Sequence, residues 1–226
     1  MENLFSVSDL IDQKILEQEH ETKEITSWHI SKVGSCLTGL YLERLGATPE
    51  KPFDSRTLRV FEVGKMFESW VIETIKDTKG YVFEEQVRVE DKDLNVSGYA
   101  DLVVTLPNGE KEVIELKSQH SRAFWYMEKS GKPSRQHQMQ LWIYLYLLNI
   151  KTGKLVYLSK DDLATAEFIV ELGDEELKAE TLGRLAILNE SWEKKIPPRP
   201  NEDKDAWENK YCRFHKQCKN QDNYLS

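Results

Sequence analysis

The sequence predicts an α/β or α+β domain. Three successive segments with the alternating pattern of β-strands lie between residues 81 and 117, and longer segments with helical periodicity precede and follow them. Strands flanked by helices along the chain are typical of these fold classes. The 226 residues suffice for one domain with its own hydrophobic core and an appended lobe built from the terminal segments.

Composition and charge exclude several classes of protein. Hydrophobic residues make up 39% of the chain and charged residues 31%, as in ordinary globular proteins. A membrane span is not expected, because no run of about 18 apolar residues occurs. The first residues lack a basic region followed by an apolar one, so we expect a cytoplasmic protein. The net charge of −8 argues against a protein that coats nucleic acid through bulk electrostatics.

Two helices are predicted ahead of the strands. Residues 1–24 are polar and acidic, which indicates an extended or loosely docked arm. Apolar residues recur at helical spacing over residues 26–45 and again over residues 59–77. The proline-containing stretch at 47–54 reads as the loop between these helices.

The strand candidates are residues 81–90, 96–106 and 111–117. The last two are joined by Pro107-Asn108-Gly109, which predicts a tight turn. A helix at 134–149, strands at 155–159 and 167–172 and a helix at 174–194 complete the prediction. We divide the chain into an arm (1–25), a core (26–196) and a C-terminal cysteine segment (197–226) that packs back on the first helix.

The length of the turn decides which side chains face one another. A two-residue loop would pair Asp101 with Leu116, whereas a three-residue loop pairs Asp101 with Glu115. Proline at the first loop position and Gly109 at the third favour the three-residue form. Two carboxylates are therefore expected side by side.

Glu115 and Lys117 are two residues apart on a strand and so lie on one face, next to Asp101. Two carboxylates in this arrangement can hold Mg²⁺ or Mn²⁺, which acidifies an attacking water during phosphodiester hydrolysis. The lysine can position that water or stabilise developing charge. The alternative is a set of exposed cross-strand ion pairs without catalytic function.

A basic segment follows the third strand. Its basic residues are interleaved with aromatic ones and oppose a single acid, Glu128. We expect this segment to contact DNA phosphates, and the alternative is an ordinary solvated loop. The candidate DNA-binding residues are Arg122, Lys129, Lys132, Arg135 and His137.

These motifs resemble those of the PD-(D/E)XK nucleases. Gly98–Asp101 and Val113–Ser118 are similar to the second and third motifs of that superfamily, and Gln140-x-x-x-Tyr144 matches a motif of its RecB-type exonuclease branch. That branch includes the CRISPR-associated four-cysteine exonucleases and their phage homologues. The resemblance implies a restriction-endonuclease-like α/β core, with a mixed sheet flanked by helices. It also implies that Gln140 and Tyr144 act at the active site, although Tyr144 could instead pack in the core and Gln140 cap a loop.

The first motif of the superfamily is only partly present. Gly64–Glu68 aligns with the pattern Gly-x-x-x-His-Glu, but Phe67 stands at the position of the metal-binding histidine. The resemblance leaves Glu68 as a candidate metal ligand. The alternative is a solvated helix residue.

The cysteines resemble the cluster ligands of the same branch, in which one N-terminal cysteine joins three near the C-terminus around a [4Fe–4S] cluster. Cys36, Cys212 and Cys218 match three of these positions, and Asn209 stands where the fourth cysteine is expected. Three interpretations remain open. The cluster persists with a substitute ligand, His215 completes a zinc site, or the cysteines are buried small hydrophobic residues.

Taken with the resemblance, the sequence predicts a Mg²⁺- or Mn²⁺-dependent DNA exonuclease. Asp101, Glu115 and Glu68 would bind the metal, and Lys117 would serve the water. The expected substrate is DNA that is single-stranded or has free ends, in recombination, phage replication or CRISPR adaptation, with protein partners in such a complex and no membrane. The alternatives are a catalytically impaired DNA-binding homologue and a structural subunit of a larger nuclease assembly.

Overall fold

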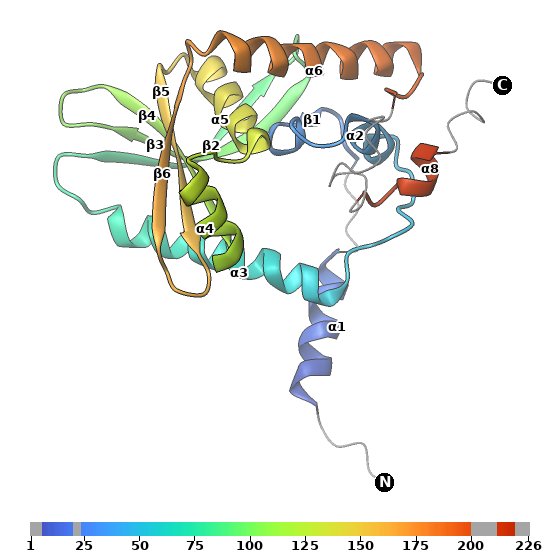
Figure 1. Cartoon of the computed structure of the whole chain (residues 1–226), viewed down its shortest axis with the longest axis horizontal. Helices are drawn as coiled ribbons and strands as arrows, with labels where there is room; N and C mark the ends of the chain where they lie inside the picture. Colours follow the sequence, from blue (N-terminus) through green and yellow to red (C-terminus); the bar gives the residue numbers. More distant parts are fainter. Residues whose placement is uncertain (1–5, 20–23, 200–211, 220–226) are drawn as a thin grey trace.

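A mixed sheet of six strands forms the centre of the computed structural model, which describes residues 6–19, 24–199 and 212–219 (Figure 1). The strand order is β1-β3-β4-β5-β6, and β2 also pairs with β3. β1 pairs with β3 and β4 with β5 in parallel, while the β2–β3, β3–β4 and β5–β6 pairs are antiparallel. The strands are β1 (Trp28–His29), β2 (Val82–Asp91), β3 (Val96–Thr105), β4 (Lys111–Gln119), β5 (Thr152–Ser159) and β6 (Thr165–Glu171).

Helices cover both faces of this sheet. Alternate residues of the strands point to opposite sides, so Val103, Val113 and Leu155 join the core under α5 while Leu102 and Leu116 pack under α3. The α-helices are α1 (Val7–Glu19), α2 (Leu37–Arg44), α3 (Ser55–Ile75), α4 (Ser121–Ser130), α5 (Arg135–Leu148), α6 (Glu175–Lys194) and α8 (His215–Lys219). A 3-10 turn, η1 (Ile30–Lys32), precedes α2. None of the described helices is long and apolar enough to span a bilayer.

The predicted helix at 26–45 is wrong over its first half. Trp28 instead pairs in parallel with Val96 and donates its backbone N–H to the carbonyl of Asn95 at 2.8 Å. Gly34 then approaches α5 so closely that a Cβ atom there would lie 2.4 Å from the Cα of Gln136. These tertiary contacts override the helical spacing of the apolar residues, and a helix forms only from Leu37.

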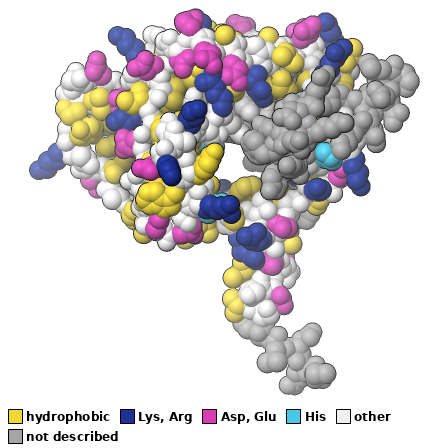
Figure 2. Space-filling model, viewed as in Figure 1, with side chains coloured by type: hydrophobic (Ala, Val, Ile, Leu, Met, Phe, Trp, Pro, Cys, Tyr) yellow, Lys and Arg dark blue, Asp and Glu magenta, His cyan; other side chains and the backbone are white. Residues whose placement is uncertain are grey.

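Two further segments differ from expectation. Much of the predicted arm is helix α1, which projects from the body (Figures 1 and 2) and pairs Asp12 with Arg59 of α3. The basic segment, for which no helix was predicted, is largely helix α4, with Phe124 and Met127 buried. His120 caps its start and Gly131, with φ of 65°, ends it. The other predicted elements are present with small differences in their limits.

Gly153 of β5 offers a test of how tightly the sheet packs against α5. A Cβ atom there would lie 2.6 Å from the carbonyl oxygen of Val113 and 3.0 Å from a methyl carbon of Leu141. We expect Gly153→Ala to lower the free energy of unfolding by about 1–3 kcal/mol, as overpacking commonly does. Gly183→Ala on α6, where a Cβ meets open space, is the matched control and should stabilise by about 0.5–1 kcal/mol. Urea unfolding measures both, and equal effects would contradict the described packing.

Candidate active site

The β3–β4 hairpin has the predicted three-residue loop. Its register runs from Thr105 opposite Lys111 to Leu102 opposite Ile114. Gly109 has φ of 85° and donates its N–H to the carbonyl of Leu106 at 2.8 Å. Continued by one residue, this register sets Asp101 opposite Glu115.

The regular β3–β4 ladder ends at Leu102, where the site begins. Beyond that point the carboxylate of Asp101 accepts the backbone N–H of Leu116, with Oδ2 2.8 Å from the nitrogen. The side chain thus takes the place of a strand carbonyl. Asp101 is buried, with 8% of its surface exposed, and its orientation is fixed by the neighbouring strand.

Glu115 is almost fully enclosed. Its Oε1 accepts hydrogen bonds from Lys117 Nζ and from Gln140 Nε2, both at 2.5 Å. Its Oε2 is buried and has no hydrogen-bond partner among the described residues. A buried carboxylate oxygen without a donor is costly unless a cation or water satisfies it.

Burial and mutual repulsion shift the titration of these groups. Burial raises the pKa of Glu115 to about 8, and the nearby charge of Asp101 adds to the increase. Burial also raises the pKa of Asp101. Burial opposes the charge on Lys117, but the surrounding carboxylates of Glu115, Asp101 and Glu68 outweigh it and raise the pKa of the ammonium. The ammonium of Lys117 therefore stays positively charged next to three acidic side chains.

The third acid, Glu68, comes from α3. Burial, followed by the charge of Asp101, raises the pKa of Glu68. Its Oε1 accepts a hydrogen bond from Gln86 Nε2 at 2.5 Å. Phe67, at the position of the family histidine, lines a cleft that Glu68 also lines. The structure thus brings Glu68, Asp101, Glu115 and Lys117 together.

This donor set fits a hard divalent cation. Mg²⁺ and Mn²⁺ prefer oxygen ligands, and Asp101, Glu115 and Glu68 offer carboxylate oxygens from two strands and one helix. Among the described residues, the ligand atoms of these three acids are less tightly gathered than the cysteine sulfurs, which all lie within 4.8 Å of one another. When Glu115 is protonated, it can share its proton with Asp101, since a side-chain hydrogen bond between the two contributes to both pKa shifts. When Glu115 is ionised, its buried Oε2 has no donor among the described residues, and a cation would satisfy it.

Gln140 and Tyr144 lie deeper than a direct contact with DNA requires. Tyr144 is 1% exposed and belongs to the core cluster under α5, while Gln140 is 4% exposed and holds Glu115. Tyr144 thus packs in the core, as the alternative interpretation expected, whereas Gln140 lines the larger of two clefts beside the site. Their position behind Glu115 fits residues that orient the site.

The residues of the basic segment separate in space. Arg122, Lys129 and Lys132 are exposed on or just after α4. Arg135 instead forms an ion pair with Glu180 of α6 at 2.7 Å, so its guanidinium is engaged by α6 and not by the carboxylates of the candidate site. On the face drawn in Figure 2, basic and acidic side chains are interspersed and do not gather into one basic patch.

His137 differs from the other DNA-binding candidates. Its Nδ1 lies 2.8 Å from the hydroxyl of Tyr157. Burial, together with the charge of Lys117, lowers the pKa of His137 to about 3. The ring is therefore neutral at physiological pH and offers no positive charge to a phosphate.

Two clefts meet at Glu68. The larger, about 840 Å³, has apolar walls from α3, β4 and β5 and ends at Lys117, His137 and Gln140. The smaller, about 500 Å³, is acidic and contains Glu73, Glu85 and Asp101. The residues predicted to carry catalysis therefore lie between an apolar cleft and an acidic one.

Gln86 is a site residue that sequence reasoning missed. It stands opposite Asp101, between the pairs Glu85–Leu102 and Val87–Ala100, and has φ of 48°. Apolar and polar residues alternate only from Val87 onward, after the polar run Glu84-Glu85-Gln86, and no glycine or asparagine signals left-handed backbone. Only the register of β2 against β3 reveals its place.

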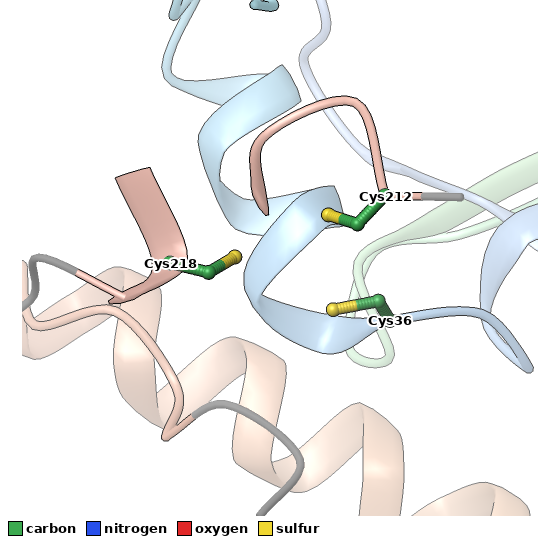
Figure 3. Close-up of side chains that lie close together, drawn as sticks. All are labelled: Cys36, Cys212 and Cys218. Carbon is green, nitrogen blue, oxygen red and sulfur yellow. The ribbon is translucent and has the colours of Figure 1, made fainter. Parts of the chain in front are cut away.

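The three cysteines converge at the other end of the molecule (Figure 3). Their sulfurs lie within 4.8 Å of one another, although Cys36 precedes α2 and the other two belong to the C-terminal segment. His215 is not part of this group, so the structure does not support the Cys3His zinc interpretation. Asn209 lies outside the described residues.

Several contacts hold the C-terminal segment in place. The carboxylate of Glu50 accepts the backbone N–H groups of Lys216 and Gln217, at 3.1 and 2.7 Å. Phe214 and Cys218 pack on Leu42 of α2 in a small hydrophobic cluster. Hydrogen bonds from the Cys212 and Cys218 thiols and from backbone N–H groups at the start of α2 lower the pKa of Cys36.

Comparison with known proteins supports the fold. No protein-family model matches the chain. The CRISPR-associated exonuclease Cas4 of Saccharolobus solfataricus is 34% identical over 137 residues, which cover 59% of this chain and 56% of that protein. The match therefore spans little more than half of the relative's length.

Solved structures match over more of the chain. The crystal structure of SSO0001 has a TM-score of 0.59 at 22% identity and covers 95% of this chain and 96% of that one. An alkaline exonuclease from Laribacter hongkongensis has a TM-score of 0.57 at 14% identity and covers 95% and 100%. These structural matches confirm the predicted fold class, and the sequence match shows that part of the chain is similar to a CRISPR-associated exonuclease.

The burial of Glu115 predicts a specific pH dependence of stability. Its pKa rises from 4.5 to about 8 on folding, so the folded state binds its proton more tightly and loses this stabilisation as the pH rises towards 8. We expect the free energy of unfolding of metal-free protein to decline between about pH 7 and 8, where His137 of the unfolded chain has largely lost its proton because its ordinary pKa is 6.5. Glu115→Gln should flatten the decline, whereas Glu112→Gln on the same strand should not. Urea unfolding with chelator present measures the slopes, and parallel slopes for all three proteins would contradict the assignment.

Proposed function

We propose that the chain is a metal-dependent DNA exonuclease. The observation that carries the proposal is the convergence of Asp101, Glu115 and Lys117, with Oε2 of Glu115 buried and unsatisfied. The sequence similarity to a CRISPR-associated exonuclease supports it. The roles of single residues and the preference for a substrate are likewise proposed.

Asp101, Glu115 and Glu68 would hold the divalent cation. When bound, Mg²⁺ or Mn²⁺ polarises the phosphoryl oxygens and lowers the pKa of the attacking water. The elevated pKa values of the three carboxyls, each raised first by burial, mean that the cation and protons compete for the same oxygens. Metal affinity should therefore increase with pH.

The protein's own groups would supply orientation and charge. Lys117 keeps its ammonium because the carboxylates around it favour the charged form, so it can donate hydrogen bonds to the negative charge that develops on the phosphoryl group. Gln140 anchors Oε1 of Glu115 and leaves Oε2 free for the cation. Tyr144 would position the site from within the core and would not bind the strand directly.

The proposed substrate is DNA with a free end, single-stranded next to the site. The apolar cleft that ends at Lys117 suits unpaired bases better than the charged surface of a duplex. Arg122, Lys129 and Lys132 remain candidates for phosphate contacts, and Arg135 is the weakest of the set because Glu180 engages it. We place the activity in recombination, phage replication or CRISPR adaptation, alongside protein partners.

A second candidate function follows from one observation. Phe67 stands at the position of the metal-binding histidine and lines the apolar cleft. If the loss of this histidine has removed the affinity for metal, the chain would be a DNA-binding homologue or a structural subunit of a nuclease assembly. Cleavage in the presence of Mn²⁺ separates these alternatives from the exonuclease.

Cleavage should require both the metal and the convergent residues. Asp101→Asn keeps an acceptor for the Leu116 N–H but removes the charge, and Lys117→Ala removes the ammonium. Each should reduce cleavage of end-labelled single-stranded DNA at least about 100-fold, as loss of a charge-stabilising group commonly does. Lys111→Ala at the far end of β4, where the lysine pairs with Glu84, is the matched control. Assays with Mn²⁺, with chelator and with duplex DNA complete the test, and parental activity in either site variant would disprove this assignment.

The cysteine cluster would hold a metal that fastens the C-terminal segment. We expect anaerobically purified protein to contain iron with brown absorbance, or about one equivalent of zinc, and Cys218→Ser to lose it together with part of the thermal stability. His215→Ala should leave the metal content unchanged, because His215 lies outside the group. Asn209→Cys should raise iron occupancy if the site is a degraded cluster. Absence of both metals from the parent protein would show that the cysteines are hydrophobic packing residues.

A further inference from the structure

Gln86 has an uncommon conformation for a residue in the middle of a strand. It lies within β2 opposite Asp101, at a φ of 48°. Residues with a Cβ rarely adopt the left-handed region, and glutamine lacks the short side chain that lets asparagine tolerate it. Such conformations persist where the surrounding structure enforces them, and here regular pairs with β3 flank the residue on both sides.

The side chain of Gln86 binds one proposed metal ligand and lies beside another. Its Nε2 donates to Oε1 of Glu68 at 2.5 Å, and the residue stands opposite Asp101, between the pairs Glu85–Leu102 and Val87–Ala100. Glu68 and Asp101 come from different elements, α3 and β3, and their charges repel each other. The amide is thus a neutral donor placed between two like charges.

We propose that Gln86 is a positioning residue that holds Glu68 towards Asp101 and so prepares the site for a divalent cation. The inference rests on the proposed function, which assigns Glu68 and Asp101 as metal ligands. A hydrogen bond to Oε1 leaves the second oxygen of Glu68 available to the metal. Partners of this kind orient carboxylate ligands, and their loss typically weakens metal affinity about 10- to 100-fold.

Glycine is the informative replacement at this position. It accepts a positive φ without strain, so Gln86→Gly removes the amide while preserving the backbone. We expect its dissociation constant for Mn²⁺ to rise about 10- to 100-fold, with a melting temperature equal to or above that of the parent protein. Leu163, which is exposed and has φ of 60°, provides the control: Leu163→Gly relieves the same kind of strain and should leave Mn²⁺ affinity unchanged.

A double-mutant comparison tests whether Gln86 acts through Glu68. In a Glu68→Ala background, Gln86→Gly should cause no further loss of Mn²⁺ affinity, because the group it positions is gone. Mn²⁺ binding is measured on the full chain without DNA, from the paramagnetic resonance signal of the free ion. A further loss as large as in the parent background would overturn the inference.

Failure of the inference differs from failure of the proposed function. If the parent binds Mn²⁺, Asp101→Asn abolishes binding and Gln86→Gly binds as the parent does, then the positioning role is overturned and the metal site stands. If the parent does not bind Mn²⁺ at millimolar concentrations, the metal-dependent function and this inference are overturned together.

Discussion

The hydrogen bond from the Leu116 amide to the Asp101 carboxylate is the interaction on which the candidate site depends. It forms where the regular β3–β4 ladder ends, so a side chain meets the demand of a buried backbone donor. Because that donor is fixed in β4, it also fixes the carboxylate. Glu115 and Lys117 are then placed relative to Asp101 by the geometry of the strands.

The acidic side chains that suit this site to bind a cation also destabilise it when no cation is bound. Three acids surround one ammonium, and burial raises the pKa of each acid. Protein groups satisfy one oxygen of Glu115 and leave the other without a donor. A buried charge without compensation destabilises the fold, so the site gains stability from whatever cation completes it. The left-handed backbone at Gln86 adds local strain at the same place, as is common where function constrains the chain.

The sequence predicted the hairpin register because Pro107 and Gly109 restrict the backbone locally, and that register predicted the two neighbouring carboxylates. α6 was predicted because its apolar periodicity agrees with its buried residues Leu177, Leu185 and Leu188. α3 and α5 form where they were predicted, but Ile72 alone is buried on α3, and α5 is buried at every residue from 139 to 145. Residues 26–36 were misassigned because contacts with Val96 and Gln136, both distant in sequence, override local spacing. Tyr144 shares a stripe with Gln140, but spacing on a helix cannot tell how deep that stripe lies. No local sequence pattern marks Gln86, because its position opposite Asp101 follows from the pairing of two neighbouring strands.

The cysteine group brings together the segments before and after the sheet. Cys36 precedes almost every element of the core, whereas Cys212 and Cys218 follow α6. A metal bound by all three sulfurs would make this stretch of chain a closed loop, which restricts the unfolded state more than the folded one. Damage to the sulfurs would then remove a tether that acts on the fold, and oxidation here could shorten the lifetime of a candidate site that is built from other elements.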